Sequence, residues 1–172
     1  MDQMTLERIK TAHPRVREQL NVLYQRANNR LGKNVRLRFT RVYSTAAEQD
    51  ELFAIGRTKR GKKVTNAKAW QSIHNYGLAF DIVLLIDMDG NGTFETASWD
   101  MLKDWDKDTQ ADWMEVVAIF KEAGWEWGGD WKKFPDGPHS QFTFGFDWKT
   151  LKARVDKGII IKDTNGLIYP KI

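Results

Sequence analysis

Cysteine is absent from this chain of 172 residues. Its absence excludes disulfide bonds and thiolate metal sites, so a metal centre here would have to use imidazole and carboxylate ligands. Histidine is scarce as well, because the sequence has only three. His13 precedes Pro14 at the start of an amphipathic stretch and is expected to open a helix. His74 and His139 are left as the imidazoles available for chemistry.

Long apolar stretches are also missing. No segment approaches the length needed to cross a membrane, and residues Met1 to Lys10 lack the apolar centre of a signal peptide. We therefore expect no membrane partner. A chain of 172 residues with 41% hydrophobic content is long enough for one well-buried core. We expect a single domain over residues 1–172, acting as a monomer.

The net charge of +4 allows attraction to anionic polymers, including nucleic acid and cell-wall polymers. Basic residues are densest between Arg57 and Lys63, a segment that follows Gly56 and contains Gly61. This cluster is either a solvated turn or a rim that steers an anionic substrate. No recognised nucleic-acid-binding motif accompanies it, so we expect no nucleic-acid partner.

Two segments carry the residues best suited to catalysis. His74 and Asp81 lie seven positions apart, and Asp136 precedes His139 by three. A catalytic zinc takes three protein ligands and keeps one position open, and His74, Asp81 and His139 would fill those roles. Asp136 is then a spare carboxylate tethered beside the metal, where a general base must lie.

Asp81 is the one acidic residue in the apolar segment Leu78–Leu85, which is expected to form a buried strand. Burying an unpaired charge costs roughly several kcal/mol of folding free energy, so metal coordination is the simplest explanation for a carboxylate there. A salt bridge is the alternative.

These residues resemble the signature of zinc peptidases of the D-alanyl-D-alanine carboxypeptidase and L-alanyl-D-glutamate endopeptidase group, which includes vancomycin-resistance dipeptidases and phage endolysins. That signature is Ser-x-His-x-x-Gly-x-Ala-x-Asp, followed later by Glu or Asp-x-x-His. Its first half matches here at Ser72, His74, Gly77, Ala79 and Asp81. Many members carry Glu where this chain has the shorter Asp136, although some endolysin-like members also use Asp.

The resemblance extends over about residues 35–146, through Arg41, Gln49 and the Glu126–Trp131 segment. It implies an α+β fold, with a small antiparallel sheet flanked by helices as in Hedgehog and D,D-peptidase domains. Residues 35–146 would form the core, with an N-terminal helix at 14–31 and a short tail at 147–172. The tail is too short for a typical wall-binding domain.

The resemblance implies zinc-dependent hydrolysis of peptidoglycan stem peptides, most simply between L-alanine and D-glutamate. Two alternatives stay open. The same site could act as a D,D- or L,D-carboxypeptidase on a free C-terminus, or the chain could be an inactive wall-binding zinc module. With no signal peptide visible, we expect a phage or prophage endolysin that collects in the cytoplasm until release to the cell wall, or a secreted enzyme whose leader has been removed.

Four further residues are candidates for substrate contacts. Arg41 resembles an arginine that clamps a carbonyl or carboxylate, with a surface ion pair as the alternative. Gln49, Ser72 and Trp127 are expected to bind substrate, although Gln49 could be an ordinary helix residue and Ser72 a local turn cap. Trp125 and Trp131 are further candidates for a groove.

A second metal site is suggested by Asp87, Asp89 and Asn91, which place oxygen ligands at alternate positions and are followed by Gly92 at the sixth. The second half of a calcium loop does not match, because Ser98 stands where a bidentate Glu belongs. The segment is therefore either a calcium site or a plain Asp/Asn/Gly hairpin turn.

The hydrophobic pattern predicts the remaining elements. Residues 14–31 have a helical period, residues 34–43 alternate as a strand does, and residues 45–55 form a helix with Glu48 completing a capping box. Residues 109–123 return to a helical period. Short strands and turns at 125–146, a short helix ending near Lys157 and a hairpin around residues 164–166 complete the prediction.

Overall fold

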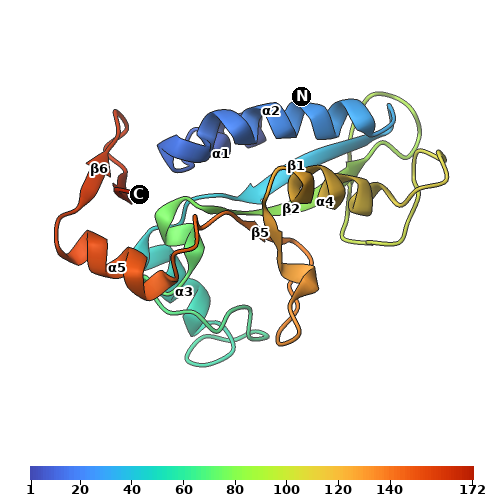
Figure 1. Cartoon of the computed structure of the whole chain (residues 1–172). Helices are drawn as coiled ribbons and strands as arrows, with labels where there is room; N and C mark the ends of the chain where they lie inside the picture. Colours follow the sequence, from blue (N-terminus) through green and yellow to red (C-terminus); the bar gives the residue numbers. More distant parts are fainter.

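The computed structural model describes all 172 residues and centres on an antiparallel sheet (Figure 1). Its strand order is β1-β2-β5-β4, with β3 paired to the far end of β2. The strands are β1 (Val35–Arg41), β2 (Ala79–Ile86), β3 (Thr96–Ser98), β4 (Glu126–Trp127) and β5 (His139–Gln141). Together with five α-helices, this sheet confirms the predicted α+β fold.

Helices α2 (Pro14–Arg30) and α4 (Asp112–Glu122) cover the sheet with their apolar faces. Aromatic rings join the layers: Phe80 lies between Phe39 and Phe120, with ring centroids 4.5 and 4.6 Å away, respectively. Burial of this apolar surface is the main stabilising contribution, because each fully buried large side chain contributes roughly 1.5–3 kcal/mol.

Most predicted helices are present close to their expected bounds. As predicted, α2 opens at His13, which caps it and has Pro14 at the first helical position. Helix α3 (Ala46–Ala54) begins with the predicted capping box between Thr45 and Glu48. Helix α1 (Gln3–Ile9) was not predicted. Its cap, Asp2, also forms an ion pair with Arg38.

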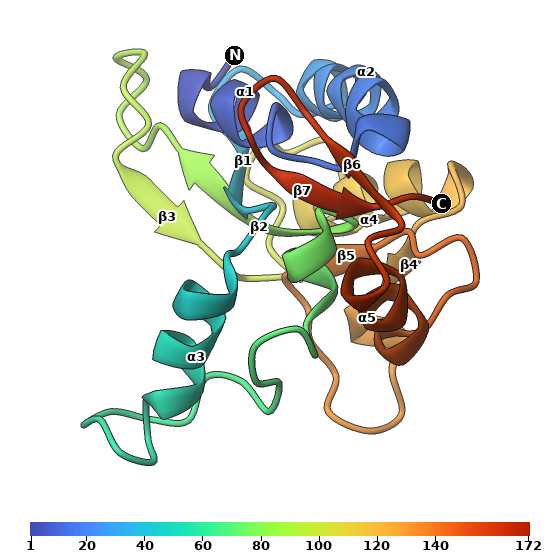
Figure 2. The same cartoon turned by 90° about the vertical axis from the view of Figure 1, so that its left-hand side faces the viewer.

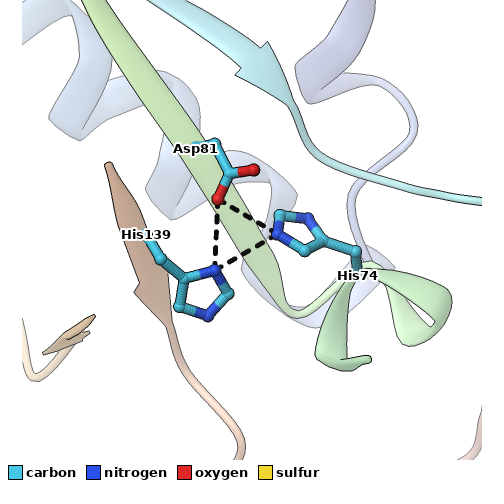
Figure 3. Close-up of side chains that lie close together, drawn as sticks. All are labelled: His74, Asp81 and His139. Atoms are coloured by element: carbon cyan, nitrogen blue, oxygen red, sulfur yellow. Dashed lines mark hydrogen bonds and ion pairs between the residues drawn. The ribbon is translucent and has the colours of Figure 1, made fainter. Parts of the chain in front are cut away.

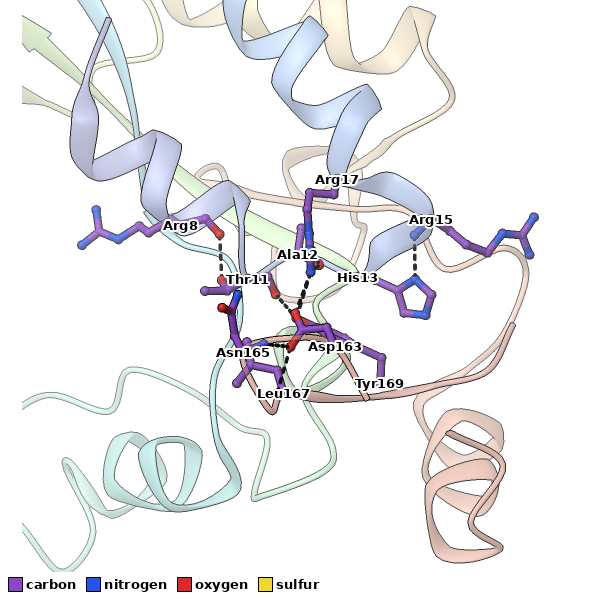
Figure 4. A network of polar contacts seen from close by, with 10 residues as sticks. All are labelled: Arg8, Thr11, Ala12, His13, Arg15, Arg17, Asp163, Asn165, Leu167 and Tyr169. Carbon is purple, nitrogen blue, oxygen red and sulfur yellow. Dashed lines mark hydrogen bonds and ion pairs between the residues drawn. The ribbon is translucent and has the colours of Figure 1, made fainter. Parts of the chain in front are cut away.

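Residues 147–172 form α5 (Trp148–Asp156) and a hairpin of β6 (Ile160–Lys162) and β7 (Ile168–Pro170), as predicted. The hairpin covers the corner between α1 and α2 (Figure 2). The Tyr169 hydroxyl donates to the Thr11 carbonyl at 3.0 Å, and Arg17 pairs with Asp163 at 3.0 Å (Figure 4). His13 Nε2 donates to the Pro170 carbonyl at 2.9 Å, since its Nδ1 accepts from the Arg15 amide.

The contacts of the β6–β7 hairpin with residues 11–17, called the hairpin clasp below, also support the segment that carries His74. Gly77 ends the 3-10 helix η1 (Ile73–Tyr76) with a φ of 65°, and its carbonyl accepts from the His13 amide. A Cβ at Gly77 would lie 2.7 Å from the His13 nitrogen and 2.9 Å from the Tyr169 ring. Only glycine fits this close approach.

None of the helices has the length and apolarity to span a bilayer.

Candidate active site

Three side chains from three elements converge at the end of the sheet (Figure 3). His74 comes from η1, Asp81 from β2 and His139 from the first residue of β5. His74 Nε2 lies 3.1 Å from Asp81 Oδ1 and 3.2 Å from His139 Nδ1, and the third side of the triangle, His139 Nδ1 to Asp81 Oδ1, is 3.1 Å. The structure thus brings together the predicted metal ligands.

The second nitrogen of each imidazole fixes the tautomer. His74 Nδ1 lies 2.9 Å from the Val42 carbonyl, which accepts only, so this nitrogen carries the proton. His139 Nε2 lies 3.1 Å from Gln141 Oε1, and the Gln141 nitrogen donates to Glu126 at 3.0 Å, which fixes the orientation of the amide. His74 Nε2 and His139 Nδ1 are therefore unprotonated in the neutral rings, and their lone pairs face the Asp81 carboxylate.

Three converging lone pairs repel one another unless a cation lies between them. Tetrahedral zinc, with bonds near 2.0–2.1 Å, holds its ligand atoms about 3.3 Å apart, which agrees with the triangle observed here. The donor set of two neutral imidazoles and one carboxylate also fits zinc. Burial alone would raise the pKa of Asp81, whereas His74 and His139, when their rings are protonated, would hold it well below its usual range. Asp81 is thus in the ionised form that a ligand requires.

Arg41 lies beside Asp81 because of a bulge in β1. The register shifts between Phe39 and Arg41, so that Arg41 rather than Thr40 pairs with Asp81. Arg41 Nε lies 3.7 Å from Asp81 Oδ2, on the carboxylate oxygen turned away from the imidazoles. This is a long ion pair with a partly exposed guanidinium, so the forked donors remain available to a substrate.

Asp136 lies beside the ligands without joining them. Its amide donates to the Gly128 carbonyl at 2.9 Å, and a Cβ on Gly128 would lie 2.5 Å from the Asp136 carbonyl. Partial burial raises the pKa of Asp136, and the Asp81 carboxylate raises it further, whereas His139, His74 and Arg41 oppose the shift. These effects reflect the proximity of Asp136 to the ligand cluster, as the general-base prediction requires.

A closed network supports His139 from behind. Gln141 joins His139 to Glu126, the Trp131 indole donates to Glu126, and the Trp131 ring lies 5.2 Å from the His139 ring. The network fixes the orientation of His139. Sequence reasoning did not identify Gln141 and Glu126, because their roles depend on the pairing of β4 with β5.

A groove of about 770 Å³ opens next to Asp136. One wall is the segment Lys63–Ala67, and the other consists of Trp131 and residues 133–136. Trp131 contacts both this groove and His139. The groove therefore ends beside the predicted metal ligands, and Lys63 and Lys133 stand on its two sides.

Two residues expected to contact substrate have internal partners instead. Gln49 is buried, with 1% of its surface exposed, and donates to the Ala67 carbonyl at 2.8 Å. The Trp127 indole donates to the Gly137 carbonyl at 2.7 Å. The Gln49 nitrogen and the Trp127 indole are therefore used within the protein, whereas the buried Oε1 of Gln49 has no hydrogen-bond partner. Substrate contact by either residue stays a prediction.

The other expected contacts have different surroundings. Ser72 precedes η1, and its side chain makes no capping hydrogen bond, so the hydroxyl is available. Trp125 is buried in the core, with 3% of its surface exposed, whereas Trp131 lines the groove. Trp131 is thus the aromatic residue best placed to contact a ligand.

The loop with Asp87, Asp89 and Asn91 has the compact form of a turn. Asp87 accepts hydrogen bonds from the amides of Gly90, Asn91 and Gly92 at 2.8–3.1 Å. The plain-turn alternative explains these bonds, and Asp87, Asp89 and Glu95 still bring oxygens within 4.8 Å of one another. Calcium binding at this loop stays a prediction.

The chain is similar to known peptidases. Residues 65–142 match a family model described as D-alanyl-D-alanine carboxypeptidase. The chain is 43% identical over 127 residues to the peptidoglycan L-alanyl-D-glutamate endopeptidase CwlK of Bacillus subtilis, covering 74% of this chain and 71% of that protein. The crystal structure of the Serratia marcescens L-Ala D-Glu endopeptidase ChiX has a similar fold, with a TM-score of 0.51, 24% identity, and coverage of 82% and 87% of the two chains.

Proposed function

Because this chain belongs to the D-alanyl-D-alanine carboxypeptidase and L-alanyl-D-glutamate endopeptidase family of peptidases, we propose that it hydrolyses the L-alanyl-D-glutamate bond in peptidoglycan stem peptides. The 43% identity to CwlK, which carries that activity in its name, supports this bond over others. The substrate would be the peptide part of the cell wall.

The observation that carries the proposal is the triangle of lone pairs formed by His74, Asp81 and His139, with Asp136 beside it. We propose that these three residues hold one zinc ion. When bound, zinc supplies Lewis acidity to the scissile carbonyl and lowers the pKa of water.

The chain's own residues supply the remaining steps. Asp136 takes a proton from the attacking water and returns it to the leaving amine of D-glutamate, so that the proton balance closes. Arg41 holds negative charge that develops on the substrate, or one of its carboxylates, by charge-assisted hydrogen bonds. The groove between residues 63–67 and 131–136 orients the stem peptide toward Asp136.

The test is mass spectrometry of purified peptidoglycan after digestion with zinc-loaded protein, with His139→Ala and a chelator as controls. We expect new L-alanine carboxyl termini and D-glutamate amino termini, absent from both controls. An absence of cleavage by protein with bound zinc would contradict the proposal and favour an inactive wall-binding module.

A carboxypeptidase on the same site is the second candidate, and the description of the matching family model favours it. The same digestion distinguishes the two reactions. Release of terminal D-alanine without new internal termini would identify the carboxypeptidase, because an endopeptidase leaves that residue attached.

A further inference from the structure

A twelve-residue segment before α4 carries carboxylates at the positions used by a calcium-binding loop of the EF-hand type. The first, third, fifth, ninth and twelfth positions hold Asp104, Asp106, Asp108, Asp112 and Glu115. The sixth position, normally glycine, is Thr109, and its φ of 81° lies in the left-handed region that glycine usually provides. The backbone at Thr109 thus adopts the left-handed turn of a calcium-binding loop, although the residue there is not glycine.

The carboxylates gather in two overlapping groups. Oxygens of Asp104, Asp106 and Asp108 lie within 4.8 Å of one another, and so do oxygens of Asp106, Asp112 and Glu115. Asp106 belongs to both groups. Oxygen ligands of calcium lie at 2.3–2.6 Å from the ion, so two of them are at most about 5 Å apart. The observed spacing is therefore compatible with a shared ion.

Two of these carboxylates are buried and turned into the cluster without hydrogen-bond partners on some of their oxygens. Asp112 is 0% exposed and its Oδ1 has no hydrogen-bond partner, while Glu115 is 7% exposed and its Oε2 has none, although its Oε1 pairs with Arg30. Buried carboxylates without partners are costly, and their mutual repulsion adds to that cost. A cation in the cluster would remove both penalties.

Arg30 is the only basic residue that forms ion pairs with the cluster. Its guanidinium lies 2.9 Å from Asp108 and 2.5 Å from Glu115. One positive charge faces five acidic residues, so the cluster keeps a strong negative potential. Burial raises the pKa of Asp112 to about 6, with Asp106 and Asp104 adding to the shift against the Trp105 amide. Burial is the largest cause of this shift, and the neighbouring carboxylates add to it.

We propose that residues 104–115 bind one calcium ion, separately from the catalytic zinc. The ligands are the side chains of Asp104, Asp106, Asp108 and Asp112, the carbonyl of Gln110 at the seventh position, and Glu115. Calcium suits this site better than magnesium, because calcium accepts six to eight oxygen ligands in an irregular geometry.

The bound ion would fasten the loop to the sheet and to α4. Asp106 accepts from the Gly32 amide at 2.7 Å, and Asn34 donates to the Trp105 carbonyl at 2.9 Å, so the loop already joins the α2–β1 turn. In Figure 1 this segment, coloured yellow, lies at the end of the molecule opposite α3 and α5. The expected effect is therefore on stability and not on the catalytic step.

The first test uses zinc-loaded, full-length protein with and without calcium chloride. We expect calcium at 100 times its Kd to raise Tm by roughly 5–10 °C, with less effect from magnesium. Glu115→Gln removes one charge from the acidic cluster and keeps a side-chain oxygen for Arg30, so this variant should fold and lose the calcium response. Asp89→Asn in the other acidic loop is the matched control and should keep the response.

Terbium provides a second readout, because its luminescence is sensitised by a nearby tryptophan such as Trp105. We expect terbium luminescence in the wild type, displaced by calcium and lost in Asp108→Asn. The proposal is overturned if calcium leaves Tm unchanged, or if the response survives Glu115→Gln and disappears in Asp89→Asn.

Discussion

The side-chain amide of Gln49 donates a 2.8 Å hydrogen bond to the main-chain carbonyl of Ala67. Gln49 belongs to α3 and Ala67 to one wall of the groove, so this bond fixes the position of the wall relative to the helix. A side chain buried in α3 thereby helps to shape the groove.

Gln49→Ala should loosen that wall. Loss of the amide leaves the Ala67 carbonyl without its partner, which costs about 1–3 kcal/mol of unfolding free energy. Stem-peptide kinetics should show a larger rise in KM than fall in kcat, because the catalytic groups are untouched. Chemical denaturation and steady-state kinetics measure the two effects, and an unchanged KM would contradict this role.

Asp81→Asn and Asp136→Asn should separate metal binding from proton transfer. The first variant loses a ligand, so elemental analysis should show a strong loss of zinc. The second should retain zinc at the wild-type level while kcat falls by about 10²–10⁴-fold, since a general base is lost. If Asp136→Asn also lost zinc, Asp136 would be a ligand and not the base.

Gln141→Leu tests the network behind His139. Loss of the partner that fixes the imidazole should weaken zinc affinity by about 10–100-fold, measured by competition with a chromogenic chelator. Glu126→Gln should have a smaller effect in the same direction. Lys132→Gln, an exposed change in the neighbouring turn, is the control and should leave zinc affinity unaltered.

Asp2 should make stability depend on acid pH. Burial alone would raise its pKa, but the hydrogen bonds from Arg38 and Thr5 outweigh burial and lower it. The stabilisation is therefore present above the ordinary pKa of 3.8 and is lost as the pH falls through the lower folded value. Asp2→Asn keeps an oxygen that can cap the helix but removes the carboxylate that pairs with Arg38, and it should cost about 1 kcal/mol at pH 7.

The comparison of Asp2→Asn with the wild type is made by urea denaturation at several pH values. The two proteins should differ most at neutral pH and converge in strong acid, because the Asp2 carboxyl is then uncharged in both states. A stability gap that stays constant down to pH 2 would exclude the ionised carboxylate as its cause.

Tyr169→Phe and Tyr169→Ala should show how much the Tyr169 hydroxyl and the Tyr169 ring each contribute to the free energy of unfolding. The first removes the bond to the Thr11 carbonyl and should cost about 1 kcal/mol, whereas the second empties a buried site and should cost about 3–5 kcal/mol. Thermal unfolding gives the order of the variants. Equal losses in both would mean that the hydroxyl alone matters.

The convergence of His74, Asp81 and His139 could be predicted from sequence because local patterns fix their positions. His74 precedes a glycine that ends a short helix, and Asp81 interrupts an apolar strand. Gln49 and Trp127 were placed near the substrate, but their side chains point to partners 18 and 10 residues away, a direction set by tertiary packing. Helix α1 was missed because its cap is held by Arg38, 36 residues further on.

The two acidic loops, at residues 87–92 and 104–115, also show that sequence patterns do not reveal tertiary packing. A glycine at the sixth position favoured the Asp87 loop as the calcium site, although the later segment has the fuller set of carboxylates. Burial of Asp112 and Glu115 becomes visible only when α4 packs against α2. Sequence spacing reveals which groups can meet, whereas burial and unpaired oxygens reveal which of them need a partner.

The clasp between His13 and Pro170 joins residues 157 positions apart. The corner that supports η1 is thus built from both ends of the chain, and β7 must be in place before the shell around Gly77 closes. During synthesis the N-terminal part emerges before β7, so the shell around Gly77 stays open until β7 has been made. Folding of the segment that carries His74 is therefore coupled to the synthesis of a strand far along the chain.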